Sequence, residues 1–279
     1  MHSYFGQNAA ETMSQRFDSS PPLFMRDPRT KDWFIAGNVP LLLTLLVGYV
    51  YFVKVSGPRF MKSRKPMEHL KPVIIVYNGA MVLANVYFCY KFLRRTYFGG
   101  GYNPVCQGID FQAKDKNTIG LLELCWWYLW VRVADFLDTV FFVLRKKDAH
   151  ISLLHVVHHC LVVFNGWYGI AYGADGQIMS GVCLNSFVHV VMYSYYFLSL
   201  LGPAMKKYLW WKRHLTQLQI AQFVIIFCHG TIPLAKDCGY PRTHIFIGIP
   251  QGVFFLTMFI KFYMEAYGKQ RMQRAAKVQ

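Results

Sequence analysis

Charged side chains are scarce in this sequence of 279 residues: Asp, Glu, Lys and Arg make up only 16% of it, while 54% is hydrophobic and 17% aromatic. Soluble domains usually carry about a quarter charged residues. The charges that are present lie in short blocks between long apolar runs, as in helices of roughly 20 residues that cross a bilayer. The composition therefore argues against a water-soluble protein. It predicts the lipid bilayer as a partner and, despite the net charge of +16, no nucleic acid.

The sequence also shows no cleavable signal peptide, internal repeat, low-complexity tract or second domain. The first thirty residues are polar, so the first apolar run is expected to act as an uncleaved signal anchor. We predict a lumenal N-terminal arm over residues 1–33, an all-α membrane domain over 34–266 and a basic cytosolic tail over 267–279.

Seven membrane spans are predicted, with the fourth as the weakest because histidines crowd its first half. Their ranges are 34–53, 72–92, 118–143, 150–169, 178–201, 215–234 and 245–266. The segments on the side of the C-terminus hold 18 of the 30 Lys and Arg residues, and those on the other side hold 10. Because basic residues favour the cytosolic side, the N-terminus is predicted to be lumenal and the C-terminus cytosolic.

The seven cysteines divide into two groups. Five lie inside apolar runs, where cysteine behaves as a small hydrophobic residue. Cys106 and Cys238 lie in predicted lumenal loops, where the oxidising compartment permits a disulfide between them. Two unpaired thiols are the alternative, and the bridge is favoured.

Three histidines cluster in the fourth predicted span as His155-x-x-His158-His159, and His189 lies in the next span. On a helix these three positions fall on one face. Polar groups inside a membrane are costly and usually face a bundle interior or a cavity. Four such histidines therefore predict a functional site.

Two chemistries fit a histidine cluster. The spacing is similar to the histidine boxes of membrane di-iron oxygenases and desaturases, but no second or third box is present, so ligands run short. The other chemistry is acid–base or nucleophilic, since a neutral imidazole can accept a proton or an acyl group. The second reading predicts no metal.

Further polar residues lie on the neighbouring spans. Arg132, Asp135 and Asp138 recur every three residues and are expected to pair with one another or with a histidine; a purely structural network is the alternative. A polar lining is predicted from Asn185, Tyr193, Tyr196, Gln219 and Gln222. The Arg145-Lys146-Lys147 block lies at the mouth of the histidine-bearing helices, where a phosphate-rich ligand would dock; a role in membrane topology alone is the alternative.

Four motifs together resemble the fatty acid elongases of the endoplasmic reticulum. They are Asp138-Thr139-x-Phe141-Phe142-x-Leu144-Arg145-Lys146-Lys147, the His155-x-x-His158-His159 box, His189-x-x-Met192-Tyr193-x-Tyr195-Tyr196 and Thr216-x-x-Gln219-x-x-Gln222-Phe223. The four motifs occur in the family's order and at its spacing. The resemblance as a whole covers roughly residues 30–266. The family's Lys-x-x-Glu pattern in the third span is replaced here by Arg132 and Asp135, which keep the charges but change their reach.

The resemblance implies a seven-helix bundle in which six helices surround a narrow acyl tunnel. It implies a 3-ketoacyl-CoA synthase that condenses a long-chain acyl-CoA with malonyl-CoA, with loss of carbon dioxide and without a cofactor. His158 would form an acyl-imidazole, His189 would face it, and His155, His159 and Asp138 would orient His158. Spacing alone does not choose among the three histidines, and a histidine acting only as a base also fits. The family resemblance also implies that Lys212 and Arg213, together with the Arg145-Lys146-Lys147 block, bind the phosphates of CoA.

The resemblance further implies residence in the endoplasmic reticulum membrane. Expected partners are the ketoacyl reductase, dehydratase and enoyl reductase that complete the elongation cycle. The alternatives that remain from other classes are a di-iron oxygenase or desaturase and a seven-span receptor or transporter. A receptor has no need for three imidazoles on one helix face. Acyl chain length and oligomeric state are not predicted.

Overall fold

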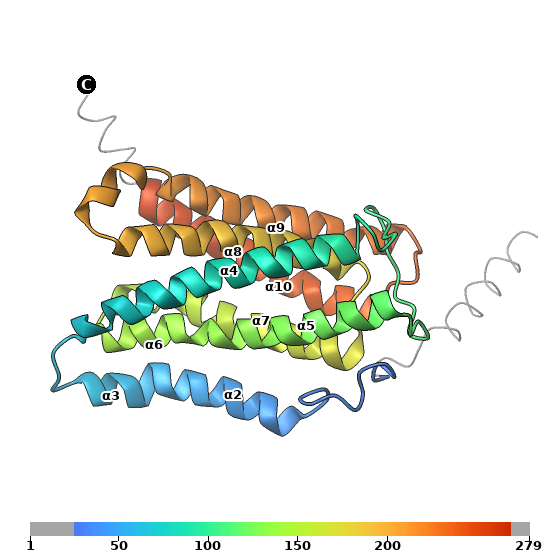
Figure 1. The fold of residues 1–279 in the computed structure, drawn as a ribbon, viewed down its shortest axis with the longest axis horizontal. Coiled ribbons are helices and arrows are strands. Elements are labelled where there is room, and N and C mark those ends of the chain that lie inside the picture. The colour runs from blue at the N-terminus through green and yellow to red at the C-terminus, as the bar shows by residue number, and fades with distance from the viewer. Residues whose placement is uncertain (1–24, 269–279) are drawn as a thin grey trace, which may run out of the picture.

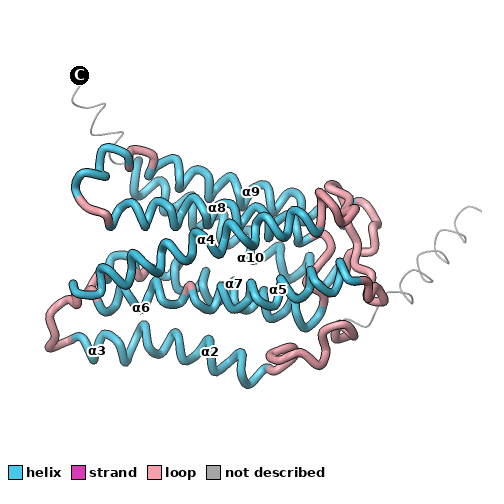
Figure 2. The backbone as a smooth tube through the Cα atoms, in the orientation of Figure 1, coloured by secondary structure: helices cyan, strands magenta, loops and turns pink. Residues whose placement is uncertain are grey.

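Long apolar helices run side by side through the part of the chain that the computed structural model describes, residues 25–268 (Figure 1). Loops connect them, and no strand occurs within that range (Figure 2). The helices are α2 (Val39–Tyr51), α3 (Gly57–Met61), α4 (Lys71–Arg95), α5 (Lys116–Ala134), α6 (Phe136–Leu144), α7 (Leu153–Tyr172), α8 (Ile178–Leu200), α9 (Lys212–Ala235) and α10 (Arg242–Tyr263). A π-helical turn, Phe52–Ser56, joins α2 to α3. Residues 1–24 of the predicted arm and 269–279 of the predicted tail lie outside the described residues.

Six helical stretches are long and apolar enough to cross a membrane. They are Val39–Met61, Glu68–Arg95, Leu153–Tyr172, Ile178–Leu200, Lys212–Ala235 and Arg242–Tyr267. Each overlaps one predicted span, so the described chain is a multi-pass, all-helical membrane protein. On the outside of the bundle, large apolar side chains such as Val76 and Leu83, each 72% exposed, are available to contact lipid.

The predicted span 118–143 differs from the other six. It consists of two helices, α5 and α6, which meet at Asp135, and neither belongs to the six stretches. Glu123 and Arg132 interrupt its apolar sequence, and aromatic residues replace aliphatic ones around Trp126. The fourth span, expected to be the weakest, is long and apolar enough in spite of its histidines.

The start of the fourth span lies three residues later than predicted. Ser152 caps α7 by accepting a hydrogen bond from the backbone N–H of His155, so that the helix begins at Leu153. His150 therefore belongs to the preceding 3₁₀ turn, Asp148–His150, and not to the span. The same kind of cap begins α5, where Asp115 accepts from the backbone of Asn117 and Thr118.

The helices pack as neighbouring pairs: α4 against α8, α5 against α7, and α9 against α10. Between α5 and α7 the contact is made by fully buried aliphatic residues, among them Leu122, Leu129 and Val163. A second cluster, with Phe92 and Leu121, joins α4 to α5. Because lipid is as apolar as these side chains, close packing holds such helices together better than hydrophobicity does.

Two loops are joined covalently at one end of the bundle. Cys106 and Cys238 form a disulfide with an S–S distance of 2.04 Å, and their Cα atoms are 5.9 Å apart. Gly108 lies directly against the carbonyl oxygen of Cys238, so close that any side chain there would collide with it. We call this end of the molecule, which holds the loops 96–115, 173–177 and 236–241, the disulfide end.

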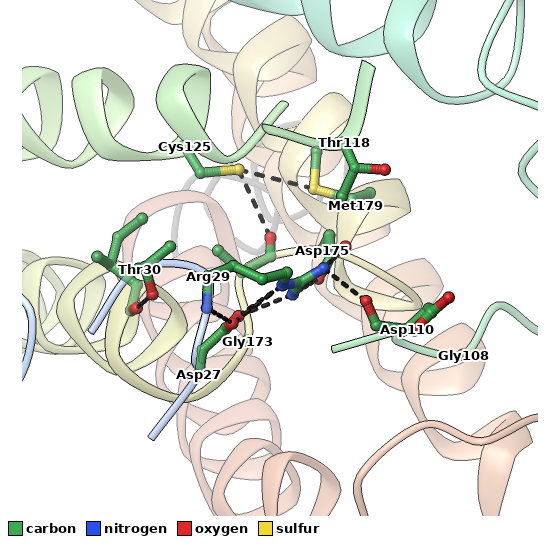
Figure 3. Close-up of polar contacts among 12 residues, drawn as sticks. Asp27, Arg29, Thr30, Gly108, Asp110, Thr118, Cys125, Gly173, Asp175 and Met179 are labelled. Carbon is green, nitrogen blue, oxygen red and sulfur yellow. Dashed lines mark hydrogen bonds and ion pairs between the residues drawn. The ribbon is translucent and has the colours of Figure 1, made fainter. Parts of the chain in front are cut away.

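A buried ion cluster ties the segment before α2 to the same end (Figure 3). The guanidinium of Arg29 contacts Asp27 at 2.7 Å and Asp175 at 2.8 Å, and it also donates to the carbonyl oxygen of Asp110 at 2.9 Å. Burial by itself lowers the pKa of Arg29, but its hydrogen bonds to the two carboxylates raise that pKa above the ordinary value. The cluster therefore links residues 27–29 to the loops after α4 and α7.

Replacing Cys106 with serine is expected to lower the free energy of unfolding by about 2 to 4 kcal/mol. The disulfide closes a loop across 132 residues of sequence, so its loss frees a long stretch of the unfolded chain. Thermal unfolding in detergent under non-reducing conditions measures the change. Cys228→Ser, at an exposed free cysteine, is the matched control. Equal stability of both variants would contradict the prediction.

Candidate active site

The spacing predicts that the three histidines of the α7 box share one face of the helix. In the structure their rings do not all point in one direction. The rings of His155 and His159 lie 4.4 Å apart, centroid to centroid, and both contact aromatic residues of α6. The ring of His158 lies 5.5 Å from His159 and packs instead against Phe255 of α10, at 5.3 Å. His155 and His159 are four residues apart on the helix and point in similar directions. His158 and His159 are consecutive and point in directions up to a third of a turn apart, which accounts for the divergence.

A cavity of about 310 Å³ lies beside His158. Its walls come from α5, α7, α8, α9 and α10, and it extends to Tyr240 and His244 at the disulfide end. Of the predicted site residues it is lined by His158, Asn185 and Gln222. His155, His159 and His189 are not among its lining residues. His158 is thus the member of the box with access to a ligand in this cavity.

His155 is held by a hydroxyl from α6. Its Nε2 lies 2.8 Å from Oγ1 of Thr139, and that hydroxyl lies 2.8 Å from the phenol of Tyr49 on α2. This chain of three side chains fixes the ring from the side away from the cavity. Thr139 belongs to the Asp-Thr motif, but its contact with His155 was not predicted.

His189, which is predicted to face His158, lies directly against a guanidinium. Arg132 lies against His189, with its Nη1 2.7 Å from Nδ1 of the imidazole. The same guanidinium donates to Oδ1 of Asn85 at 2.9 Å, forms an ion pair with Asp135 at 3.2 Å and stacks over the ring of Tyr128. It is Arg132, rather than His189, that lines the cavity.

Asp138, predicted to help orient His158, is held by a tyrosine. Its Oδ2 is 2.7 Å from the hydroxyl of Tyr193, and in the described residues no hydrogen bond joins it to a histidine. Tyr193 also contacts Oδ1 of Asp135 at 2.8 Å. The expected pairing within the Arg132, Asp135 and Asp138 stripe is therefore present, with Tyr193 as the link.

The remaining predicted lining residues are distributed unevenly. Asn185 accepts a long hydrogen bond of 3.4 Å from Tyr128, and Gln222 is buried at the cavity wall with no partner for its Oε1. Gln219 donates to the sulfur of Met192 at 3.6 Å, and Tyr196 packs edge-on against Tyr193. Neither Gln219 nor Tyr196 lines the cavity.

The end of α6 and the start of α9, which carry the predicted basic residues, lie at the end of the bundle opposite the disulfide end (Figure 1). Arg145 forms an ion pair of 2.7 Å with Glu68, and Arg213 donates to the hydroxyl of Tyr263 at 2.7 Å. Lys146 adopts a positive φ of 51° at the end of α6. We call this part of the molecule the basic end.

His150 shows that the two halves of the basic end meet. Burial, followed by the positive charges of Lys212 and Lys147, lowers the pKa of His150. Lys147 follows α6 and Lys212 begins α9, so the charge of both segments converges on one place.

Several polar residues of the site were missed as contributors. Arg132 reaches the cavity, Asn85 holds its guanidinium, and Tyr49 and Thr139 hold His155. For Arg132, the i, i+3 spacing to Asp135 indicated that the two charges pair. Asn85 and Tyr49 each lie alone among apolar residues, and only tertiary contact reveals their role. In the range 25–268, no three His, Cys, Asp or Glu side chains converge as ligands for a metal ion.

These observations define a multi-pass helical membrane protein with a buried, histidine-containing cavity. The family model described as ELO (GNS1/SUR4) matches residues 34–275. The chain belongs to this family.

Curated relatives carry the name very long chain fatty acid elongase. One from Aedes aegypti is 41% identical over 251 residues, which cover 90% of this chain and 69% of the relative. Elongase 7 of Rattus norvegicus is 41% identical over 252 residues, 89% of this chain and 88% of the relative. Elongase 4 of Mus musculus is 38% identical over 251 residues, 90% of this chain and 79% of the relative.

Proposed function

We propose that this protein condenses a long-chain acyl-CoA with malonyl-CoA and releases carbon dioxide, CoA and a 3-ketoacyl-CoA two carbons longer. The observation that supports this most directly is the position of His158. It is the one histidine of the box that borders the cavity, and Arg132 borders the same cavity as a cation. A nucleophile beside a fixed positive charge suits acyl transfer, in which negative charge develops on the carbonyl oxygen.

The reaction proceeds in two steps. A ring nitrogen of His158 attacks the thioester carbonyl, the carbon–sulfur bond breaks, and CoA leaves as the thiol with the proton of the imidazole. Malonyl-CoA then loses carbon dioxide, and the resulting enolate attacks the acyl-imidazole to form the new carbon–carbon bond. The histidine leaves and takes up one proton, so each turnover consumes one proton.

The substrates enter from the basic end and the acyl chain occupies the cavity as a tunnel. Lys146, Lys147 and Lys212 bind the CoA phosphates there, and Arg145 and Arg213 contribute if they leave Glu68 and Tyr263. The apolar walls toward the disulfide end receive the acyl chain. Gln222 and Asn185 contact the thioester or the pantetheine arm.

The chain crosses the bilayer seven times in this proposal, with α5 and α6 together as the third crossing. The N-terminus is lumenal and the C-terminus cytosolic, in the membrane of the endoplasmic reticulum. The disulfide supports this orientation, because such bonds persist in an oxidising compartment and are rare in the cytosol. The reductases and the dehydratase of the elongation cycle receive the product. The reaction needs no metal or other cofactor.

Purified protein in detergent, given labelled malonyl-CoA and a series of acyl-CoAs, is expected to release carbon dioxide and form 3-ketoacyl-CoA. Turnover should be unchanged by a metal chelator, because no step uses a metal. Absence of product at every chain length, from protein shown to be folded, would overturn the proposal. Stoichiometric iron in that protein would then favour the di-iron oxygenase.

A further inference from the structure

The hydroxyl of Tyr193 lies between two buried carboxyl groups. Its oxygen is 2.8 Å from Oδ1 of Asp135 and 2.7 Å from Oδ2 of Asp138. All three residues are buried, with Tyr193 fully enclosed. A phenol carries a single hydrogen and can donate it to one of the two oxygens only. The second short contact therefore needs a hydrogen of its own, because two oxygens without one would repel each other at this distance.

Arg132 supplies one positive charge to this group, and its contacts exclude a second charge on His189. A guanidinium has donors only, so Nδ1 of His189, at 2.7 Å from Arg132, must accept. An imidazolium would present a donor at both ring nitrogens. His189 is therefore neutral.

The surrounding residues offer no further cation. Tyr77 packs edge-on against Tyr193, and its neutral hydroxyl contacts Asp138 and Tyr193 as well as the carbonyl oxygen of Ala134 at 3.2 Å. Asn85, on the other side of Arg132, is neutral and accepts from it. Two ionised carboxylates would thus share a single guanidinium within the bundle. An unpaired negative charge there is costly, and a buried carboxyl group relieves the cost by taking up a proton.

We propose that Asp138 is a neutral carboxylic acid that donates its proton in a hydrogen bond to Tyr193. Tyr193 in turn donates to Asp135, which stays ionised because it is the ion-pair partner of Arg132 at 3.2 Å. Asp138 is a positioning residue: it acts on the cavity through Tyr193, Asp135 and Arg132. The positive charge beside His158 is therefore that of Arg132, which these contacts hold in one place. His189, which contacts Arg132, stays neutral.

Infrared difference spectroscopy tests the protonation directly. A protonated carboxyl group has a carbonyl stretch that is distinct from the carboxylate bands and shifts in D₂O. The unmodified protein at neutral pH is expected to show this band, and Asp138→Asn is expected to remove it. Asp237→Asn, at an exposed carboxylate near the disulfide, is the control and should leave it unchanged. A spectrum without the band, or a band that survives in Asp138→Asn, would overturn the proposal.

A second measurement covers the case in which Asp138→Asn fails to fold. Labelling the aspartate side chains of the unmodified protein with ¹³C at the carboxyl carbon should shift the same band. A band that does not move with this label would belong to glutamate and would refute the assignment. Neither spectrum depends on turnover, so a protein that made no 3-ketoacyl-CoA would refute the proposed function and leave this test intact.

Activity offers a third comparison, which rests on the proposed function. The amide of asparagine can donate to Tyr193 as the acid does, so Asp138→Asn should keep kcat within about tenfold of the unmodified value. Asp138→Ala leaves the Tyr193 oxygen without its donor and should lower kcat by about 5- to 150-fold. Asp135→Asn removes the charge that pairs with Arg132 and should cost more than Asp138→Asn. Equal losses for asparagine at the two positions would contradict a neutral Asp138.

Discussion

Replacing His158 with alanine is expected to abolish formation of 3-ketoacyl-CoA, with a loss in kcat of roughly 10,000-fold or more. The variant removes the one imidazole of the box that borders the cavity, and so the proposed attacking nitrogen. Its neighbours cannot replace it, because His155 is bonded to Thr139 and His159 packs against aromatic rings of α2 and α6. The measurement is product formation by purified protein.

The control for this variant is His214→Ala. His214 is exposed at the basic end, where it contacts Gln217, and its removal should leave kcat nearly unchanged. Size-exclusion chromatography and thermal unfolding establish that both variants are folded. Turnover by His158→Ala close to that of the control would remove His158 from the mechanism.

Mass spectrometry separates the covalent route from one in which His158 acts only as a base. With acyl-CoA and no malonyl-CoA, the unmodified protein should carry one acyl group on the peptide that contains His158. His158→Ala should carry none. An unmodified protein that turns over but never acquires the acyl group would favour the base, and the loss in the alanine variant would then reflect the activation of malonyl-CoA.

Most of the helices could be predicted from sequence because they are long apolar runs. Six of the seven predicted spans coincide with stretches that can cross a membrane. The exception, α5 with α6, carries Arg132 and Asp135 where the two helices meet. Such charges lower the mean hydropathy of a segment, so that it is less readily recognised as a span. In the structure they pair with each other, as their i, i+3 spacing predicts, although a hydropathy average does not register the pairing.

The histidines show where spacing stops being informative. Three histidines within five residues lie on one side of α7, but which of them meets a cavity depends on the helices opposite. Phe255 of α10 and the open space beside it receive His158, whereas Thr139 of α6 receives His155. The contact between Arg132 and His189 joins residues 57 positions apart in the sequence, which no local period reveals.

Substitution of Arg29 by methionine is expected to lower the free energy of unfolding by about 3 to 5 kcal/mol, because it leaves two buried carboxylates without their cation. Asp27 and the Arg29 side chain are fully buried, and the Asp175 side chain is only 5% exposed.

The cluster lies beside the cavity wall at the disulfide end, since Gly173 and Ala174, which directly precede Asp175 in the sequence, line that cavity. Activity should therefore fall together with stability.

The double variant Asp27→Asn with Asp175→Asn in the Arg29→Met background removes the unpaired charges and should recover part of the lost stability. Thermal unfolding of the three proteins at one detergent concentration measures this. If Arg29→Met unfolds at the same temperature as the unmodified protein, the cluster does not hold the segment before α2. If the triple variant is no more stable than Arg29→Met, the loss comes from missing contacts and not from buried charge.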